Sequence, residues 1–330
     1  MKKVIALSLS LVMLVGVMTA CSDNKTEETT TAAETTAAAE TSADETTEAT
    51  TEEAKGDPFF TYTDAYGNEV VIQEEPKTIV SVSPTMTEIV FALGEGSRII
   101  GRTDFDDYPA EVLDLPAVGA IDNPDIEAIA ALEPDLVLAS SIFTEDAYNQ
   151  LTELGFTVAI VRDEQSFDGV YDSIDVVSDI LGVSDKGDAL VADLKAQVDE
   201  IVADEDTDKT VYYCMGCGEY GEFTAGGDTF INDIIEMAGA KNAAADLEGW
   251  TYSLEALIAA DPDYVLVSQW YYDEFTTNEN YADLSAVKNG NVILVDSNLF
   301  DRQGPRNVEA LKLVHDIVTG AYETEEAAAA

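Results

Sequence analysis

A helix-and-strand motif occurs twice in this chain, as Asp125-Ile-Glu-Ala-Ile-Ala-Ala-Leu-Glu-Pro-Asp-Leu-Val-Leu-Ala-Ser-Ser141 and as Ser253-Leu-Glu-Ala-Leu-Ile-Ala-Ala-Asp-Pro-Asp-Tyr-Val-Leu-Val-Ser-Gln269. Eight of the 17 aligned positions are identical, at a constant offset of 128 residues. Each copy predicts a short helix that ends at an acidic residue followed by Pro-Asp, and then a buried strand. Because two copies are too few for a solenoid, we expect two similarly built lobes.

Short apolar strands alternate with amphipathic helices around both copies. In the first half, two strands around a Gly-Asn turn precede strands at 78–83, 99–102, 136–139 and 157–161 and helices at 87–93, 125–132, 145–154 and 167–181. The second half has strands at 210–213, 264–268 and 292–295 and helices at 229–238, 254–260 and 307–322. This alternation predicts the α/β class, with mainly parallel, doubly wound sheets.

A single long helix is predicted between the two halves, from Ser184, which is an acceptable N-cap, to about residue 203. Its apolar stripe recurs at helical spacing and consists of Leu190, Leu194, Val198 and Ile201. We therefore expect an N-terminal lobe at 57–183, a linking helix at 184–205, a C-terminal lobe at 206–324 and a frayed tail at 325–330.

The N-terminal residues 1–21 are typical of a secretory signal peptide. A basic start precedes an apolar stretch at 4–17, which is too short for a comfortable membrane span, and small residues precede Cys21. This end resembles a bacterial lipobox, although Met18 stands where that pattern more often has Leu. The resemblance implies a lipoprotein with lipidated Cys21; the alternative is an ordinary secretion signal with a chance Cys. Residues 22–56 contain 11 Thr, 8 Ala and 8 Glu, which predicts a disordered tether.

The composition argues against several classes of function. The chain has 66 acidic and 16 basic residues and a formal net charge of −50, whereas nucleic-acid binding requires a basic face. The single His, His315, excludes a metal site of several imidazoles. A Ser-His-Asp triad could use only this His, which lies inside a predicted helix. We therefore expect neither an enzyme nor a nucleic-acid partner, and no cofactor or resident metal.

Cys214-Met-Gly-Cys217 is the one sharp local motif, and it follows the first strand of the second half. It is compatible with a redox dithiol or a soft-metal site. It is equally compatible with a local disulfide or with two free thiols in a loop, because CxxC alone is a weak signal. We favour these two structural interpretations and treat Cys214 and Cys217 as a possible disulfide.

Aromatic residues cluster near the predicted strand ends, which is where open α/β sheets bind ligands. They are Phe105, Tyr108, Tyr212, Tyr213, Tyr220, Phe223, Trp250, Trp270, Tyr271, Tyr272 and Phe300. We expect about half of them to face a cleft between the lobes and the others to belong to the core.

Two glutamates, Glu127 and Glu255, occupy matching positions of the repeated motif, in the first turn of each short helix. One interpretation is that each carboxylate simply complements the helix dipole. The other is that each lobe offers one exposed acid to a basic partner. The symmetry favours the second interpretation.

Several segments resemble the substrate-binding proteins of bacterial ABC importers for cobalamin, haem and ferric siderophores. They are Thr78-Ile-Val-Ser-Val-Ser-Pro-Thr-Met-Thr-Glu-Ile-Val-Phe-Ala-Leu-Gly94, Ile100-Gly-Arg-Thr-Asp-Phe-Asp-Asp-Tyr-Pro109, Val118-Gly-Ala-Ile-Asp-Asn-Pro-Asp-Ile-Glu127, Phe223-Thr-Ala-Gly-Gly-Asp-Thr229 and Arg302-Gln-Gly-Pro-Arg306. The resemblance spans about 57–322. It implies a class III periplasmic-binding fold, in which two Rossmann-like lobes are joined by a single long α-helix, with the ligand in the cleft and little hinge closure.

The resemblance also implies roles for individual residues. Glu127 and Glu255 would dock into Arg-bearing pockets of the permease, and Ile121 stands where the best-known cobalamin binder has a Trp. Phe105 and Phe223 match ring-contacting positions of cobalamin binders, and Trp250 is shifted by one residue from another. The turn Pro84-Thr85-Met86 matches a ligand-facing loop, and Arg302 matches a basic contact. With Trp270 and Tyr271 from the aromatic set, the predicted ligand residues are Pro84, Thr85, Met86, Phe105, Ile121, Phe223, Trp250, Trp270, Tyr271 and Arg302.

These inferences predict a monomeric, lipid-anchored solute-binding protein at the outer face of the cytoplasmic membrane. It would deliver a metal chelate to the permease and ATPase of an ABC importer. A nearly neutral cobalamin or other corrinoid suits the residues, because anionic siderophores need convergent cations and haem needs an axial His or Tyr. The alternatives are a ferric-siderophore or haem receptor of the same family, an extracytoplasmic CxxC thiol oxidoreductase, and a surface scaffold or adhesin.

Overall fold

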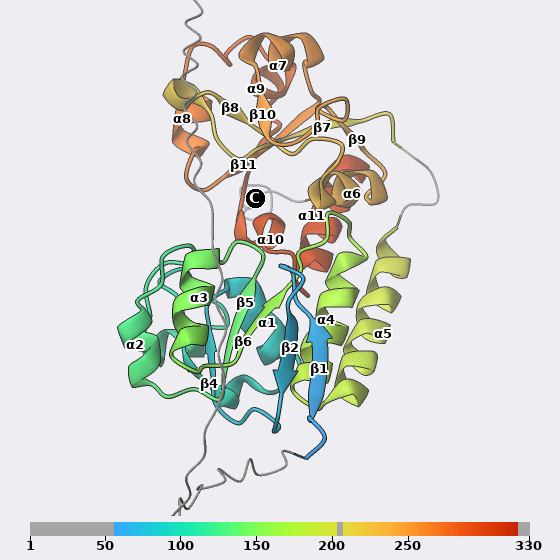
Figure 1. The fold of residues 1–330 in the computed structure, drawn as a ribbon. Coiled ribbons are helices and arrows are strands. Elements are labelled where there is room, and N and C mark those ends of the chain that lie inside the picture. Colours follow the sequence, from blue (N-terminus) through green and yellow to red (C-terminus); the bar gives the residue numbers. More distant parts are fainter. Residues whose placement is uncertain (1–55, 203–206, 323–330) are drawn as a thin grey trace, which may run out of the picture. The chain divides into compact units, whose positions relative to one another are not determined.

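The computed structural model describes residues 56–202 and 207–322 (Figure 1). The expected signal peptide with Cys21, the tether up to residue 55 and the tail at 325–330 lie outside the described residues. Within the described ranges, no helix combines the length and the apolar composition that crossing a membrane requires.

The N-terminal lobe contains a four-stranded parallel sheet with flanking helices. In spatial order its strands are β4 (Ile99–Gly101), β3 (Ile79–Ser81), β5 (Leu136–Ser140) and β6 (Val158–Val161). Its helices are α1 (Pro84–Ala92), α2 (Ile126–Ala131), α3 (Glu145–Glu153) and α4 (Gly169–Ile180), with 3-10 turns at Gly96–Arg98 and Ala110–Asp114. A separate antiparallel hairpin of β1 (Phe60–Thr63) and β2 (Glu69–Ile72) confirms the two strands predicted around the Gly-Asn turn.

The C-terminal lobe has a second sheet of the same kind. In spatial order its strands are β12 (Val292–Val295), β11 (Tyr264–Ser268), β7 (Thr210–Cys214) and β9 (Lys241–Asn242). A small antiparallel pair is formed by β8 (Glu222–Phe223) and β10 (Thr251–Tyr252). The helices are α6 (Phe230–Met237), α7 (Leu254–Ala260), α8 (Tyr272–Thr277), α9 (Ser285–Asn289), α10 (Asn298–Asp301) and α11 (Asn307–Thr319), with a 3-10 turn at Gly218–Tyr220.

The two four-stranded sheets have the same connectivity. In each, the first strand in sequence lies between the second and the third, and the fourth forms an edge. All neighbouring strands within these two sheets are parallel. This arrangement confirms the predicted α/β class with two Rossmann-like lobes. Ligands of such sheets bind beyond the carboxyl ends of the strands, near the point where the strand order reverses.

The repeated motif forms the same structure in both lobes, as α2 followed by β5 and as α7 followed by β11. Glu133 and Asp261 occupy equivalent positions just before the prolines of the two copies. Both adopt the left-handed backbone conformation, with φ of 48° and 41°. This conformation is uncommon for a residue with a side chain, and it turns the chain from the helix toward the next strand.

The aspartate after each of these prolines fixes the start of the neighbouring central strand. Oδ2 of Asp135 accepts hydrogen bonds from the backbone N–H groups of Lys77 and Thr78 at 2.8 and 2.9 Å. Oδ2 of Asp263 accepts from the backbone N–H and the hydroxyl of Thr210 at 2.9 and 3.1 Å. The pKa of each carboxyl group is lower than its usual value. Partial burial acts to raise this pKa, but the hydrogen bonds to the ionised form have the larger effect.

The long helix α5 (Ser184–Ile201) lies between the two sheets in the sequence, as predicted. It packs against α4 and α11. Leu194 and Val198 of the predicted stripe are buried. Ser184 is the first helical residue and not the N-cap, and its hydroxyl donates to Oδ1 of Asp179 at 2.6 Å.

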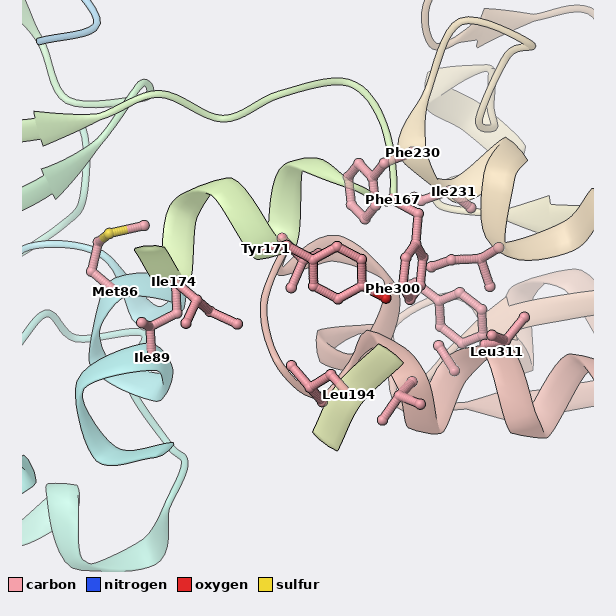
Figure 2. Close-up of a cluster of buried hydrophobic side chains, with 14 of the residues drawn as sticks. Met86, Ile89, Phe167, Tyr171, Ile174, Leu194, Phe230, Ile231, Phe300 and Leu311 are labelled. Atoms are coloured by element: carbon pink, nitrogen blue, oxygen red, sulfur yellow. The ribbon is translucent and has the colours of Figure 1, made fainter. Parts of the chain in front are cut away.

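The largest apolar core cluster contains residues of both lobes. Figure 2 shows Tyr171 of α4, and Phe167 just before this helix, close to Phe300 and Leu311 from the C-terminal segments. Because this packing continues from one lobe into the other, the two lobes together form one compact unit. The lobe limits at 57–183 and 206–324 therefore stay predictions.

We expect Asp135→Ala and Asp263→Ala each to lower the free energy of unfolding by about 1–2 kcal/mol, because each change leaves backbone donors without their charged acceptor. Since the folded-state pKa is depressed, this stability is present above the unfolded carboxyl pKa of about 3.9 and is lost as the pH falls through the folded value. Urea unfolding at a series of pH values measures the effect. The exposed Asp122→Ala is the control, and a difference from wild type that stays constant into strong acid would contradict the explanation.

Candidate functional site

A cavity of about 1440 Å³ lies at the carboxyl ends of both sheets. In the N-terminal lobe its lining follows or ends β3, β4, β5 and β6, and comprises Ser83, Pro84, Thr85, Asp104, Phe105, Asp107, Ile121, Ser140, Ser141, Ile142, Asp163 and Gln165. In the C-terminal lobe it includes Met215 after β7, Gln269 and Trp270 after β11, and Asp296, Ser297 and Asn298 after β12. Typical small-molecule sites occupy about 300–1,000 Å³, so this cavity has room for a large ligand.

Seven of the predicted ligand residues line this cavity, and their contact with a ligand stays a prediction. They are Pro84, Thr85, Phe105, Ile121, Trp250, Trp270 and Arg302. The three aromatic members are exposed: the exposed fraction is 57% for Phe105, 38% for Trp250 and 78% for Trp270. Large apolar side chains exposed around one hollow are typical of a binding surface.

The structure does not bring Met86, Phe223 and Tyr271 to the cavity wall. Met86 is fully buried and packs in the core, beside Ile89 in Figure 2, because it lies on the inner face of α1. Phe223 belongs to β8 and pairs with Thr251 of β10. Tyr271 packs against the core cluster of the C-terminal lobe. The described cavity wall does not include these three residues, and their contact with a ligand stays a prediction.

Fewer members of the aromatic set line the cavity than expected. Of its eleven members, Phe105, Trp250 and Trp270 line the cavity, whereas about half were expected to do so. Tyr212, Tyr213 and Phe300 are fully buried. The rings of Tyr213 and Phe300 stack with their centroids 4.9 Å apart, so they contribute to the core beneath the cavity.

Arg302 lines the cavity, but its guanidinium is bound by the protein itself. Nη1 donates to Oε1 of Glu88 and to Oδ1 of Asp107, each at 2.7 Å, and Nη2 donates to the carbonyl of Phe105 at 2.9 Å. The side chain is only 10% exposed. These bonds connect the end of α10, in the C-terminal lobe, to two parts of the N-terminal lobe: helix α1 and the loop after β4. We call this group of Arg302, Glu88, Asp107 and the Phe105 carbonyl the inter-lobe latch.

A second arginine adds to this latch. Nη1 of Arg306 lies 3.5 Å from Oε1 of Glu88, and its guanidinium stacks over the ring of Tyr108 at 4.0 Å from the centroid. The Glu88 side chain is 2% exposed. Burial raises the pKa of Glu88 above its usual value, although hydrogen bonding and attraction from the arginines act in the opposite direction.

Sequence reasoning missed Glu88, Asp107 and several polar cavity residues. Glu88 is the only charged residue of α1, and a charge on a buried helix face indicates a buried partner. The missed side-chain amides are Gln165, Gln269, Asn298 and Gln303. Most of them follow strand ends, so their position in the chain was the available signal.

Glu127 and Glu255 lie at equivalent exposed positions in the first turns of α2 and α7. The helices begin alike: the side chain of Asp125 accepts from the backbone N–H of Ala128, and that of Ser253 from Ala256. Neither glutamate lines the cavity. This placement leaves both available to a partner, and their docking role stays a prediction.

Cys214 and Cys217 are free, buried thiols in this structure, so the possible disulfide is not formed here. The thiol of Cys214 donates a hydrogen bond to Cys217, which raises the pKa of Cys214 and lowers that of Cys217. Cys217 precedes a single 3-10 turn and not an α-helix, so the helix N-terminus of a thioredoxin-like site is missing at this point. Among the described residues, no group of three or more His, Cys, Asp or Glu could hold a metal ion.

Residues 79–299 match the family described as "Periplasmic binding protein". The chain is 36% identical over 262 residues to the uncharacterized ABC transporter substrate-binding lipoprotein YvrC of Bacillus subtilis, covering 76% of this chain and 83% of that protein. It is 31% identical over 269 residues to a cobalamin-binding protein of Halobacterium salinarum, covering 76% and 72%. A solved structure, the apo form of the periplasmic heme-binding protein RhuT from Roseiflexus sp. RS-1, aligns with a TM-score of 0.69 at 28% identity, covering 74% of this chain and 98% of that one.

We expect Arg302→Met to lower the free energy of unfolding by about 3–5 kcal/mol, because it leaves the buried carboxylate of Glu88 without its main partner. Adding Glu88→Gln to that variant removes the stranded charge and should restore part of the loss. Chemical denaturation of the two single variants and the double variant measures the coupling. The control is Arg162→Met, since Arg162 is exposed. Strictly additive effects of the two substitutions would contradict the latch.

Proposed function

Because this chain belongs to the periplasmic binding protein family, we propose that it captures a bulky metal chelate outside the cytoplasmic membrane and delivers it to the permease and ATPase of an ABC importer. The observation that carries the proposal is the cavity of about 1440 Å³, built from the strand ends of both lobes. Under this proposal the chain is a monomer held at the outer face of that membrane by a lipid on Cys21, and it works by binding and release without catalysis.

A corrinoid such as cobalamin is the ligand that we favour. Flat aromatic and apolar surface is available on Phe105, Trp250 and Trp270 for a macrocycle. Hydroxyl and amide groups of Ser140, Gln165, Gln269, Asn298 and their neighbours can bond to the amide side chains of a corrin ring. The similarity to a cobalamin-binding protein of Halobacterium salinarum supports the same choice.

Anionic chelates and haem fit these residues less well. Arg302 is the only Lys, Arg or His among the described lining residues, and the latch already binds its guanidinium. Acidic siderophores and citrate complexes would need several convergent cations. The described lining also has neither a His nor a Tyr that could serve as an axial ligand to haem iron.

Delivery requires contact with the permease, and we assign it to Glu127 and Glu255. One acid on each lobe, at equivalent exposed positions, suits a partner that presents two basic pockets. Both lie on short helices outside the cavity lining, so docking and ligand binding use separate surfaces.

We expect calorimetric titration of the purified protein to show tight binding of cyanocobalamin and weaker or no binding of haem and ferric siderophores. The physical reason is the size of the cavity together with its lack of available cations. Trp270→Ala should weaken cyanocobalamin binding, and Ile258→Ala, which removes an exposed apolar side chain outside the cavity, is the matched control. Tight binding of a siderophore or haem with none of cyanocobalamin would replace the corrinoid by that ligand.

We expect Glu127→Lys with Glu255→Lys to abolish uptake in cells that carry the cognate permease, while the calorimetric affinity for the ligand stays unchanged. Reversed charges would repel the basic pockets that the docking model requires. Glu145→Lys reverses an equally exposed acid in the first turn of α3 and serves as the control. If the double variant instead loses affinity for the ligand, the two glutamates act on the cavity and the docking assignment is wrong.

A further inference from the structure

Acidic side chains dominate the charge of the cavity. Among the described lining residues one is basic, Arg302, and five are acidic: Asp104, Asp107, Asp163, Asp296 and Asp301. The electrostatic preference of the cavity therefore depends on how many of these acids are neutralised by cations of the protein itself.

Two of the five acids are paired with arginines. Oδ1 of Asp107 binds Nη1 of Arg302 at 2.7 Å, and Oδ2 of Asp296 lies 3.6 Å from Nη2 of Arg306. Both guanidinium groups also face the buried carboxylate of Glu88. Nε of Arg306 also lies 3.7 Å from Oε1 of Glu309. The two positive charges thus face four carboxylates, so neither arginine has an unpaired positive charge to offer a ligand.

Asp104, Asp163 and Asp301 form no ion pair within the described part of the chain. Oδ2 of Asp163 accepts from the backbone N–H of Ser141, and Oδ1 of Asp301 accepts from the hydroxyl of Tyr213, each at 2.9 Å. These neutral donors orient the carboxylates without cancelling their charge. Burial raises the pKa of Asp163, which means that the protein stabilises its negative charge incompletely. A positive charge on a ligand near Asp163 would add the electrostatic stabilisation that this carboxylate lacks.

We propose that the cavity selects for positive charge on its ligand, so that a chelate with a cationic substituent binds more tightly than its neutral and anionic analogues. The inference rests on the function proposed above and adds the charge class of the ligand. A cleft with low-dielectric walls and charges of one sign concentrates ions of the opposite sign, and the net charge of −50 acts in the same direction. At separations of several ångströms each unit of ligand charge changes affinity by roughly fivefold at low salt.

A charge series on one scaffold tests this proposal. The probes are cyanocobalamin, its derivative with one peripheral amide hydrolysed to a carboxylate, and its derivative with an aminoethyl amide at the same position. These three molecules share the metal, the axial ligands and the ring, and they differ by one unit of charge at each step. Calorimetry of the full chain at low salt should rank the cationic probe first and the anionic probe last, and high salt should bring the three affinities together.

Variants of the unpaired acids test whether the cavity causes the ranking of the three probes by affinity. Asp104→Asn and Asp163→Asn should each reduce the ratio of cationic to anionic affinity by roughly fivefold, with a smaller effect on the neutral probe. Asp114→Asn removes an exposed charge that does not line the cavity and should leave the ratio unchanged.

The outcomes separate this inference from the function on which it rests. Equal affinities, a reversed ranking, or a ratio of cationic to anionic affinity that stays unchanged in both cavity variants would overturn the charge selection while leaving corrinoid binding in place. Failure of all three probes to bind would overturn the corrinoid proposal and the charge selection together.

Discussion

The buried ion pair between Arg302 and Glu88 is the contact on which the shape of the cavity depends. It joins residues 214 positions apart in the chain, one from each lobe. Because the Glu88 side chain is 2% exposed, water cannot solvate its charge, and the arginine must remain in place. The same guanidinium binds Asp107 and the carbonyl of Phe105, so the C-terminal lobe positions the loop after β4. The position of this part of the cavity wall therefore depends on contacts between the two lobes.

The fold was largely predictable because its information is local. Apolar strands, helix spacing and the repeated Pro-Asp motif predicted two parallel sheets and the helix between them, since each pattern lies within about 20 residues. The role of Asp135 and Asp263 was not predictable, because their partners lie more than 50 residues away. The left-handed conformation of Glu133 and Asp261 could not be predicted from the residue types either, since neither residue is a glycine. Their identical place in the repeat was the only available signal.

The candidate site was predictable at the level of strand ends and less so at the level of side chains. Pro84 and Thr85 line the cavity but Met86 does not, because in the first turn of a helix successive side chains point about 100° apart. Arg302 was placed at the cavity by resemblance, and its internal partners could not be foreseen from residues so distant in sequence. A single carboxylate on the buried face of α1 was the clue that such a partner exists.

Stability alone does not explain why a buried ion pair joins the lobes, since well-packed apolar residues often serve as well or better. A planar guanidinium with several acceptors fixes orientation, which an apolar contact does not. An apolar replacement for Arg302 would still let the lobes pack through the core around Phe300. It would release the carbonyl of Phe105 and leave Asp107 with the neutral donor Nδ2 of Asn298 at 3.1 Å. The geometry of the cavity and its charge are therefore coupled. The guanidinium that holds the carbonyl of Phe105 is also the one cation that lines the cavity in the described part of the chain, and its charge is already paired within the protein.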